Sequence, residues 1–343
     1  MKAISVIIPC YNVDAYLDRC LTSVVSQTIG TENLEIICID DASSDGTWER
    51  LKVWERQYPD HILLIRQETN RRQGAARNIG LTYASADWVA FVDADDWLEP
   101  DYLEQLYKPA MEYPCDVVCC GEVRDFSDTL SYLDEKTREA GQDRYIVTET
   151  EEARKYMITS LAGGEAVWGK LVRRKTLLEA QIYFPEELVY EDMYWHTMLH
   201  IYAFGFYVVN KKLYHYFANY QSTALSMNET WHMDWLTVQV EKWAEYRRRG
   251  LLERYREELE FDCLRDAVGF LKLIVLRYEE PPFSFFQLGR TLIRGMVPDY
   301  RANPYLVHFT DFYRALLEAL YVPVGRTEFE EIARQARRYW GER

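Results

Sequence analysis

Short apolar runs alternate with segments of helical periodicity over roughly the first 120 residues, and this alternation restricts the fold more than any other feature. The apolar runs are rich in β-branched residues and end at polar or turn-forming residues, as strands do. The predicted strands are 4–8, 34–39, 62–65, 88–92 and 117–120, and the predicted helices are 14–27, 47–58, 74–84 and 100–110. Because continuous apolar strands separated by helices are typical of a covered parallel sheet, we expect an α/β domain with a mostly parallel central sheet.

Polar residues follow three of the predicted strands, at positions 9–12, 40–46 and 93–96, and the last two groups are acidic. Ligands of open α/β sheets bind at the carboxyl ends of the strands, and these ends meet at one edge of a parallel sheet. The three groups are therefore the first candidates for a functional site.

The strongest group is FVDADDWLEP, in which Asp93, Asp95 and Asp96 lie in one tight turn. Carboxylates this close repel one another unless a cation joins them or protons are taken up. Mg²⁺ or Mn²⁺ commonly bridges a few carboxylates to a diphosphate. The alternative is a solvated acidic turn in which Asp96 caps a following helix. The position at a strand end favours a cation site.

Asp40 and Asp41 follow the second predicted strand and leave two interpretations open. A carboxylate at this edge of the sheet could accept a hydrogen bond from a nucleobase N–H. Ser43, Ser44 and Asp45 could equally cap the next helix.

The segment ETNRRQGAARNIG combines a glycine at a predicted helix start with three arginines. Gly74 permits close backbone approach, and a helix N-terminus favours an anion. Arg71, Arg72 and Arg77 add positive charge to an acidic chain. Alone, this segment is better explained as a surface helix with ordinary basic residues.

Glu191 and Asp192 open a further predicted helix. Acidic residues in a first turn often do no more than complement the helix dipole, and this is the alternative to a catalytic role. The predicted inward face of this helix is Trp195, Met198, Leu199 and Tyr202.

The rest of the chain is predicted to be a polar surface excursion at 124–144, a mixed region at 148–228 and an almost wholly helical region from Trp231 onward, with a helix stop at Gly250. The last segment carries an apolar stripe beside several arginines, which suits a helix packed on its domain or one lying on an anionic membrane surface. The stripe is Phe329, Ile332, Ala336 and Trp340.

The charge balance and the cysteines narrow the setting. Acidic residues outnumber basic ones by 55 to 40 in the 343 residues, so nucleic acid is not expected as a partner. The seven cysteines form no pair of C-x-x-C units, which indicates reduced thiols in a cytoplasmic protein rather than disulfides or a zinc site. We also expect no signal peptide, because the apolar part of MKAISVIIPCYN is short, and no membrane helix, because no apolar run approaches ~20 residues.

Taken in order, the segments SVIIPCYN, IDDASSDGT, NRRQGAARNIG, FVDADDWL, WGKL and YEDMYW resemble family 2 glycosyltransferases of the GT-A fold. The resemblance covers roughly residues 3–225. It implies a GT-A-type nucleotide-binding domain at 1–225, with a donor half at about 1–123 and an acceptor half at about 124–225. A helical C-terminal region at 226–343 follows, which the resemblance does not cover.

The resemblance also implies roles for residues of the donor side. Pro9 and Tyr11 line the base pocket, and Asp41 contacts the base, with Asp40 as the less favoured alternative. Arg77 lies near the nucleotide.

For the acidic turn, the resemblance implies that Asp93 approaches the ribose and that Asp95 ligates a divalent metal, Mn²⁺ or Mg²⁺. Asp96 has a supporting role that the resemblance does not define. The favoured nucleotide is UDP.

For the acceptor side, the resemblance implies that Asp192 is the general base and that Glu191 and Trp168 shape the acceptor site. The expected reaction is an inverting transfer from a nucleotide-diphosphate sugar to a hydroxyl of a saccharide or lipid-linked acceptor, in the synthesis of surface polysaccharide or glycolipid. Peripheral contact with the inner face of the membrane and a homodimer are further hypotheses.

One departure from the family pattern concerns the segment YHYFANYQST, which has no arginine where family members often carry one. His215 or Gln221 could replace it, although His215 alone is better explained as a packed core histidine.

Two other functions are compatible with parts of this pattern. A sugar-phosphate nucleotidyltransferase would need a glycine-rich loop after the first strand, and PCYNVDAY has no glycine. A catalytically silent nucleotide-sugar-binding scaffold is the remaining alternative, since fold and motif do not prove turnover.

Overall fold

The computed structural model describes residues 2–127, 129–218 and 229–341. The chain divides into two compact units. Unit 1 is Met1–Met157 with Leu161–Asn219, and unit 2 is Ile158–Ser160 with Tyr220–Arg343. The boundary expected at 225–226 lies outside the described residues.

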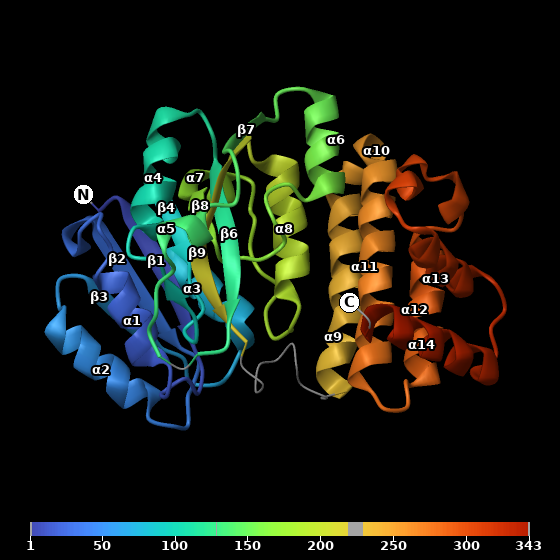
Figure 1. Cartoon of the computed structure of the whole chain (residues 1–343), viewed down its shortest axis with the longest axis horizontal. Helices are drawn as coiled ribbons and strands as arrows, with labels where there is room; N and C mark the ends of the chain where they lie inside the picture. The colour runs from blue at the N-terminus through green and yellow to red at the C-terminus, as the bar shows by residue number, and fades with distance from the viewer. Residues whose placement is uncertain (1, 128, 219–228, 342–343) are drawn as a thin grey trace. The chain divides into compact units, whose positions relative to one another are not determined.

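Unit 1 is built on a mixed sheet that has nine strands within the described residues (Figure 1). Its order is β3-β2-β1-β4-β8-β6-β9-β5, and β7 pairs with β9. The strands are β1 Ile4–Cys10, β2 Leu34–Asp40, β3 Ile62–Arg66, β4 Trp88–Phe91, β5 Trp97–Leu98, β6 Val117–Asp125, β7 Arg144–Val147, β8 Lys170–Arg173 and β9 Gly205–Phe217.

The first four strands of this order form the parallel half of the sheet, as the sequence predicts. Cys10 pairs with Asp40, and Ile7 pairs with Phe91, so the ends of β1, β2 and β4 are close in register. The polar groups after these three strands therefore share one edge of the sheet.

The second half of the sheet is mixed. Strand β8 pairs antiparallel with both β4 and β6, and β9 runs parallel to β6 with register shifts on either side of Gly121. Within the region predicted to be mixed, the segments GFYVV and LYHYF are the two ends of the single strand β9. Strand β9 also pairs antiparallel with β5, immediately after the acidic turn.

Helices cover both faces of the parallel half. On one face, Ile4, Val6 and Ile8 pack in a cluster that includes Leu21 of α1 and Leu103 of α4. On the other, a Cβ at Gly80 of α3 would lie 2.4 Å from Ile7, so a glycine is needed for this helix to approach β1. The helices of unit 1 are α1 Leu17–Val25, α2 Thr47–Gln57, α3 Arg72–Tyr83, α4 Tyr102–Glu112, α5 Glu135–Arg138, α6 Glu151–Ser160, α7 Arg174–Glu179 and α8 Glu191–Tyr202, with α6 ending in unit 2.

Unit 2 is helical, as predicted. Gly250 has φ +68 just after α9, which confirms the predicted stop. Trp235 stacks on Phe270 at 4.6 Å, and Phe286 stacks on Phe329 at 4.5 Å, so aromatic side chains hold the helices together. The helices are α9 Glu229–Arg248, α10 Leu251–Arg254, α11 Arg256–Arg277, α12 Phe283–Met296, α13 Asp311–Tyr321 and α14 Arg326–Gly341, with short 3₁₀ turns at Tyr300–Ala302 and Pro304–His308.

The apolar stripe of the last helix, α14, is used inside unit 2. Phe329 and Ala336 are buried, and Arg337 donates hydrogen bonds to the backbone carbonyls of Val275, Tyr278 and Glu279. These contacts confirm the interpretation of α14 as a helix packed on its own domain. Among the described residues, no helix combines the length and apolar character that crossing a membrane requires.

Candidate active site

The acidic turn between β4 and β5 is fixed by Asp96, whose carboxylate is buried. One oxygen, Oδ2, accepts a hydrogen bond from the Tyr214 hydroxyl at 2.6 Å, and Oδ1 accepts one from the backbone N–H of Phe217 at 2.8 Å. Burial, and then the charges of Asp95 and Asp93, raise the pKa of Asp96. The helix-cap interpretation of Asp96 is wrong, because β5 follows it and the N-cap of α4 is Asp101.

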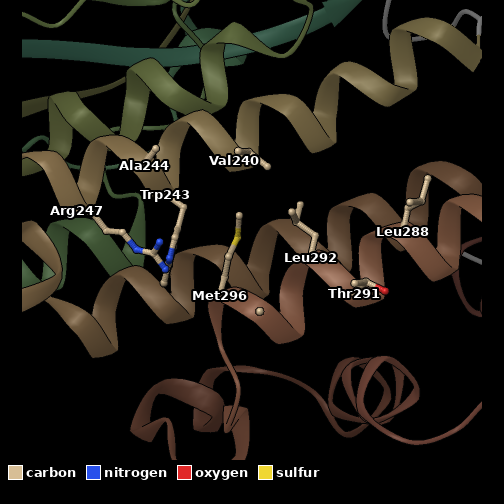
Figure 2. Close-up of a pocket in the computed structure, with 9 residues that line it drawn as sticks. Val240, Trp243, Ala244, Arg247, Leu288, Thr291, Leu292 and Met296 are labelled. Atoms are coloured by element: carbon tan, nitrogen blue, oxygen red, sulfur yellow. The ribbon is translucent and has the colours of Figure 1, made fainter.

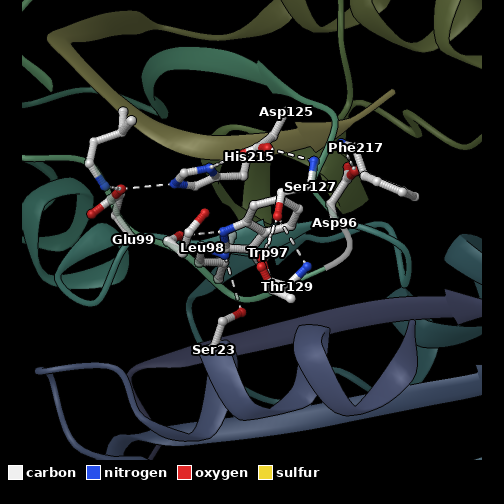
Figure 3. Close-up of polar contacts among 12 residues, drawn as sticks. Ser23, Asp96, Trp97, Leu98, Glu99, Asp125, Ser127, Thr129, His215 and Phe217 are labelled. Carbon is white, nitrogen blue, oxygen red and sulfur yellow. Dashed lines mark hydrogen bonds and ion pairs between the residues drawn. The ribbon is translucent and has the colours of Figure 1, made fainter. Parts of the chain in front are cut away.

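The strand pair β5–β9 behind this turn is held by a polar and aromatic cluster (Figure 3). The His215 ring stacks on Trp97 at 4.7 Å, and its nitrogens lie 2.8 Å from Glu99 Oε1 and 3.3 Å from Asp125 Oδ2. His215 is therefore a packed core histidine, as the sequence favours. Gln221, the other residue considered as an arginine replacement, lies outside the described residues.

Arg19 of α1 contacts the acidic turn from the other side. Its guanidinium donates to the backbone carbonyl of Asp95 at 2.6 Å and to that of Ser127 at 2.7 Å. It also lies over the rings of Trp97 and Phe217, at 4.1 and 4.4 Å from their centroids. These contacts fix the backbone of Asp95. Sequence reasoning missed this residue, because a single arginine in an amphipathic helix carries no motif.

Arg77 of α3 joins the acidic turn to the start of α8. Its side chain is buried, and Nη2 donates to Asp93 Oδ1 at 2.8 Å, while Nη1 donates to Glu191 Oε1. Burial lowers the pKa of Arg77, but Asp93 and Glu191 outweigh this effect and hold the pKa above its ordinary value. The guanidinium is therefore a permanent positive charge between two predicted site carboxylates.

Asp192 lies directly beside this ion pair. Helix α8 begins after Tyr190, whose φ of 67 places it in a left-handed conformation that few non-glycine residues adopt. Desolvation and the neighbouring charge of Glu191 raise the pKa of Asp192 to about 7, against the opposing charge of Arg77. Asp192 is thus a carboxyl group whose proton affinity suits a general base near neutral pH.

The ends of β1 and β2 bring the predicted base-pocket residues to the same edge. Asp41 is buried, and its Oδ1 accepts hydrogen bonds from Gln67 Nε2 at 2.6 Å and from the backbone N–H of Arg71 at 2.8 Å. Desolvation raises the pKa of Asp41, although the backbone N–H groups of Arg71 and Arg72 oppose the shift. Pro9 is partly buried at the end of β1.

Asp40 and Tyr11 differ sharply in exposure. The Asp40 carboxylate is fully buried and pairs with Arg66 Nε at 3.0 Å, which gives it a structural role. The ring of Tyr11, just beyond β1, is 47% exposed and is accessible to a ligand.

Trp168 forms an aromatic layer with β9. Its ring stacks on Tyr214 at 4.5 Å with an interplanar angle of 9°, and on Tyr216 at 5.6 Å. The Tyr214 hydroxyl also accepts the backbone N–H of Asp93 at 3.1 Å. Trp168 is therefore connected to the acidic turn through one tyrosine.

Gly74 does not act as the sequence suggests. A Cβ at this position would lie 2.1 Å from the carbonyl oxygen of Pro185, so glycine is required because α3 packs against the segment before α8. Helix α3 also begins two residues earlier, at Arg72. The group that approaches Gly74 closely is therefore the backbone of Pro185 rather than a ligand.

Comparison with known proteins identifies the family of this chain. The model of the family described as Glycosyl transferase family 2 matches residues 5–176, half of the chain. The chain belongs to glycosyltransferase family 2. The family resemblance inferred from the motifs is thereby confirmed.

Relatives of this family 2 chain include two bacterial proteins. Glycosyltransferase GlyA of Streptococcus pneumoniae is 32% identical over 251 residues, which are 71% of this chain and 34% of GlyA. Putative glycosyltransferase EpsH of Bacillus subtilis is 29% identical over 276 residues, 78% of this chain and 76% of EpsH. The chain thus spans about a third of GlyA and about three quarters of EpsH.

A solved structure of similar fold is that of residues 1–349 of S. aureus TarS, with a TM-score of 0.63 and 21% identity over 98% of this chain and 92% of that one. TarS has also been solved in complex with UDP-GlcNAc, and that structure has a TM-score of 0.57 and 22% identity. The likeness confirms the expected GT-A-type α/β architecture of this family 2 chain.

The acidic turn fits the chemistry of a divalent metal that is shared with a substrate. Within the described residues, no group of three or more His, Cys, Asp or Glu side chains is arranged to hold a metal ion. Mg²⁺, however, is usually bound through one or two carboxylates and the oxygens of substrate phosphates. Both carboxylate oxygens of Asp96 accept hydrogen bonds from β9, whereas Asp95 and Asp93 are partly exposed. The turn therefore presents carboxylates, the type of ligand that Mg²⁺ prefers.

Proposed function

We propose that this chain is an inverting glycosyltransferase that moves a sugar from a nucleotide-diphosphate sugar to an acceptor hydroxyl. The observation that carries the proposal is the contact of Arg77 with both Asp93 and Glu191, beside an Asp192 carboxyl whose pKa is raised to about 7. The buried guanidinium of Arg77 therefore connects Asp93, on the proposed donor side, to the start of the helix that carries the candidate base Asp192. UDP is the favoured nucleotide, and the TarS complex with UDP-GlcNAc supports this choice.

On the donor side, we assign the base pocket to Pro9, Tyr11 and Asp41. The exposed ring of Tyr11 would stack on the base, and Asp41, rather than the fully buried Asp40, would accept its N–H. These residues belong to a donor half at about 1–123.

At the acidic turn, Asp93 would contact the ribose while it pairs with Arg77. Asp95 would ligate Mn²⁺ or Mg²⁺, and the metal, when bound, would stabilise the charge of the departing diphosphate. Arg19 would hold the backbone of Asp95 in place through the Asp95 carbonyl.

Asp192 would act as the general base. As the acceptor oxygen attacks the anomeric carbon, the Asp192 carboxylate takes the proton of the hydroxyl, and one in-line displacement inverts the configuration. Glu191 cannot easily share this role, because it is buried and paired with Arg77. Its charge instead raises the pKa of Asp192.

On the acceptor side, Trp168 and Glu191 would shape the site, within an acceptor half at about 124–225. The stacked rings of Trp168 and Tyr216 are partly exposed and suit contact with a saccharide ring, whereas the fully buried Tyr214 packs against Trp168. We assign the acceptor to a saccharide or lipid-linked saccharide of surface polysaccharide or glycolipid synthesis, with the enzyme at the inner face of the membrane or in the cytoplasm. The helical C-terminal region at 226–343 would form the remainder of the enzyme.

The first experiment is a calorimetric titration of the purified chain with UDP, with and without Mn²⁺, beside Asp95→Ala. We expect metal-dependent binding that the variant loses. A screen of UDP-sugars follows, with the anomeric configuration of the product read by NMR. A product of retained configuration would contradict the inverting mechanism. Binding without turnover of any donor would favour the silent nucleotide-sugar-binding scaffold.

A further inference from the structure

Unit 2 contains an apolar groove that the proposed reaction does not use. It lies between α9 and α12, has a volume of about 490 Å³ and is lined mainly by apolar side chains (Figure 2). Val240, Trp243 and Arg247 come from α9, and Leu288, Leu292 and Met296 come from α12. The spacing of three or four residues on both helices gives the groove two facing helical stripes, about 10 Å long at 1.5 Å per residue.

Two apolar side chains in the walls of the groove are exposed to solvent. Val240 is 46% exposed and Leu288 is 49% exposed, although both lie beside the well-packed interior of unit 2. An alkyl chain in the groove would remove this surface from water, which is the main source of affinity for an apolar ligand.

One end of the groove carries two hydrogen-bond donors. Figure 2 shows Arg247 and Trp243 together at one end and Leu288 at the other. The Trp243 side chain is 5% exposed, and its indole nitrogen has no hydrogen-bond acceptor in the part of the chain that the structure describes. A buried donor without an acceptor is costly, and this cost is removed when a ligand supplies one.

Arg247 is set apart from the two arginines that follow it. Arg248 and Arg249 both pair with Glu245, whereas no ion pair involving Arg247 occurs among the described residues. Among the described residues that line the groove, none is acidic. The charge at this end therefore complements an anion, and the guanidinium fork suits the oxygens of a phosphate.

We propose that this groove binds an amphiphile with a single alkyl chain and a phosphate head group. The alkyl chain lies between the stripes of α9 and α12, and the phosphate accepts hydrogen bonds from Arg247 and the indole N–H of Trp243. This site is independent of the proposed transfer reaction and needs no residue of unit 1.

The test is a calorimetric titration of the full chain with decyl phosphate below its micellar concentration, beside decyl maltoside, which has the same chain and a neutral head. We expect saturable binding of one decyl phosphate, and binding of decyl maltoside that is about tenfold weaker, since hydrogen bonds to charged groups are the strong ones. Arg247→Gln should reduce decyl phosphate binding to the level of decyl maltoside. Trp243→Phe should weaken decyl phosphate binding only, by a few-fold.

Three further variants distinguish binding in the groove from general effects of charge. Arg248→Gln removes a neighbouring, ion-paired arginine and should leave binding unchanged. Leu292→Asp and Leu288→Asp place a carboxylate in the groove and should abolish binding of both probes, and Leu288 is exposed enough for that variant to fold.

Several results would overturn the proposal. They are the absence of saturable binding, equal losses in Arg247→Gln and Arg248→Gln, or tighter binding of decanoate than of decyl phosphate. A dimer in sedimentation experiments that Leu288→Asp dissociates, together with no decyl phosphate binding, would assign the groove to a second copy of the chain.

Discussion

Each unit of the molecule buries a cation between two carboxylates, and the two clusters differ in how their charge is balanced. In unit 1, Arg77 contacts Asp93 and Glu191, and the carboxyl of Asp192 lies beside them. In unit 2, Lys242 contacts Asp262 at 2.7 Å and Asp266 at 2.6 Å. The clusters are similar in composition but not in setting.

The cluster of unit 2 is closed. Arg265 adds a second cation against Asp262, the Tyr246 hydroxyl donates to Asp262, and Gln239 donates to Asp266. Lys242 is almost fully buried, so these contacts satisfy groups that water does not reach. This cluster joins α9 to α11. Among its described residues, two cations, Lys242 and Arg265, balance two carboxylates, Asp262 and Asp266.

The cluster of unit 1 is open and has an excess of acid. Asp93 is 25% exposed. Arg77 is a single cation that contacts two carboxylates, those of Asp93 and Glu191. It also lies at the carboxyl edge of the parallel strands, where α/β sheets bind ligands. A buried ion pair alone is therefore poor evidence of function, whereas one with unbalanced charge at this edge is good evidence.

The largest expected effect is that of Asp192→Asn, which removes the proposed base and keeps its shape. We expect kcat to fall by about 10²- to 10⁴-fold, the usual contribution of general base catalysis, with UDP binding retained. Initial rates with the donor found in the screen measure this. The exposed carboxylate of Asp311 provides the matched control, since Asp311→Asn should leave kcat unchanged. A rate for Asp192→Asn within threefold of the wild type would exclude the assigned role.

The second prediction compares the two clusters directly through Arg77→Met and Lys242→Met. Each variant removes a buried cation that contacts two carboxylates and leaves one buried carboxylate, Glu191 or Asp266, without its cation, so we expect each to lose about 3–5 kcal/mol of unfolding free energy in urea. Only Arg77→Met should also lose UDP binding per folded molecule. Equal losses of UDP binding in both variants would mean that the open cluster has no special role.

The third prediction concerns pH. Because the pKa of Asp192 is raised to about 7, the base is protonated at lower pH, and kcat/KM should rise through pH 7 and then level off. At pH 6 we expect about one tenth of the plateau value, since one pH unit corresponds to a tenfold change in the ionised fraction. A profile that is flat between pH 5.5 and 8 would contradict this assignment.

The same shift in the pKa of Asp192 predicts that the stability of the folded state falls over the pH range in which kcat/KM rises. A carboxyl whose pKa is raised on folding destabilises the folded state as pH rises from its unfolded pKa, about 4, towards 7. Asp192→Asn should therefore be no more stable than the wild type at pH 4 and more stable at pH 8. Thermal melts at the two pH values measure the difference.

The smallest expected effect is that of Arg19→Lys, which keeps the charge but loses the fork that holds two carbonyls. We expect Mn²⁺-dependent UDP binding to weaken by a few-fold, because each lost hydrogen bond to a charged group is partly replaced. Arg56→Lys, in the last turn of α2, is the control. Wild-type metal dependence in Arg19→Lys would show that the Asp95 carbonyl needs no such support.

The parallel half of the sheet could be predicted because each of its strands is a continuous apolar run bounded by turn residues. The mixed half could not be predicted in the same way. Strand β8 is only four residues long, and the polar residues in the middle of β9 divide its pattern in two. The insertion of β8 between β4 and β6 depends on contacts that are distant in sequence, which local periodicity does not record.

The candidate site, like the sheet, could be predicted only in part from the sequence. The acidic residues at strand ends and the start of α8 carry recognisable motifs, whereas Arg19 and Tyr214 act through a backbone carbonyl and a hydroxyl. Their roles depend on where α1 and β9 pack, so no spacing reveals them. Gly74 shows the reverse case, in which a motif residue is explained by packing against Pro185.

Tyr214 has a consequence for the binding of the two proposed substrates. Its ring stacks on Trp168, and its hydroxyl bonds both Asp96 and the backbone of Asp93, so one rigid side chain belongs to both proposed substrate sites. A shift of Trp168 on acceptor binding would therefore alter the donor turn. Thermodynamic linkage makes such coupling reciprocal, so a donor that tightens the turn changes acceptor affinity by the same factor. The affinities for donor and acceptor would then be coupled through a single aromatic stack.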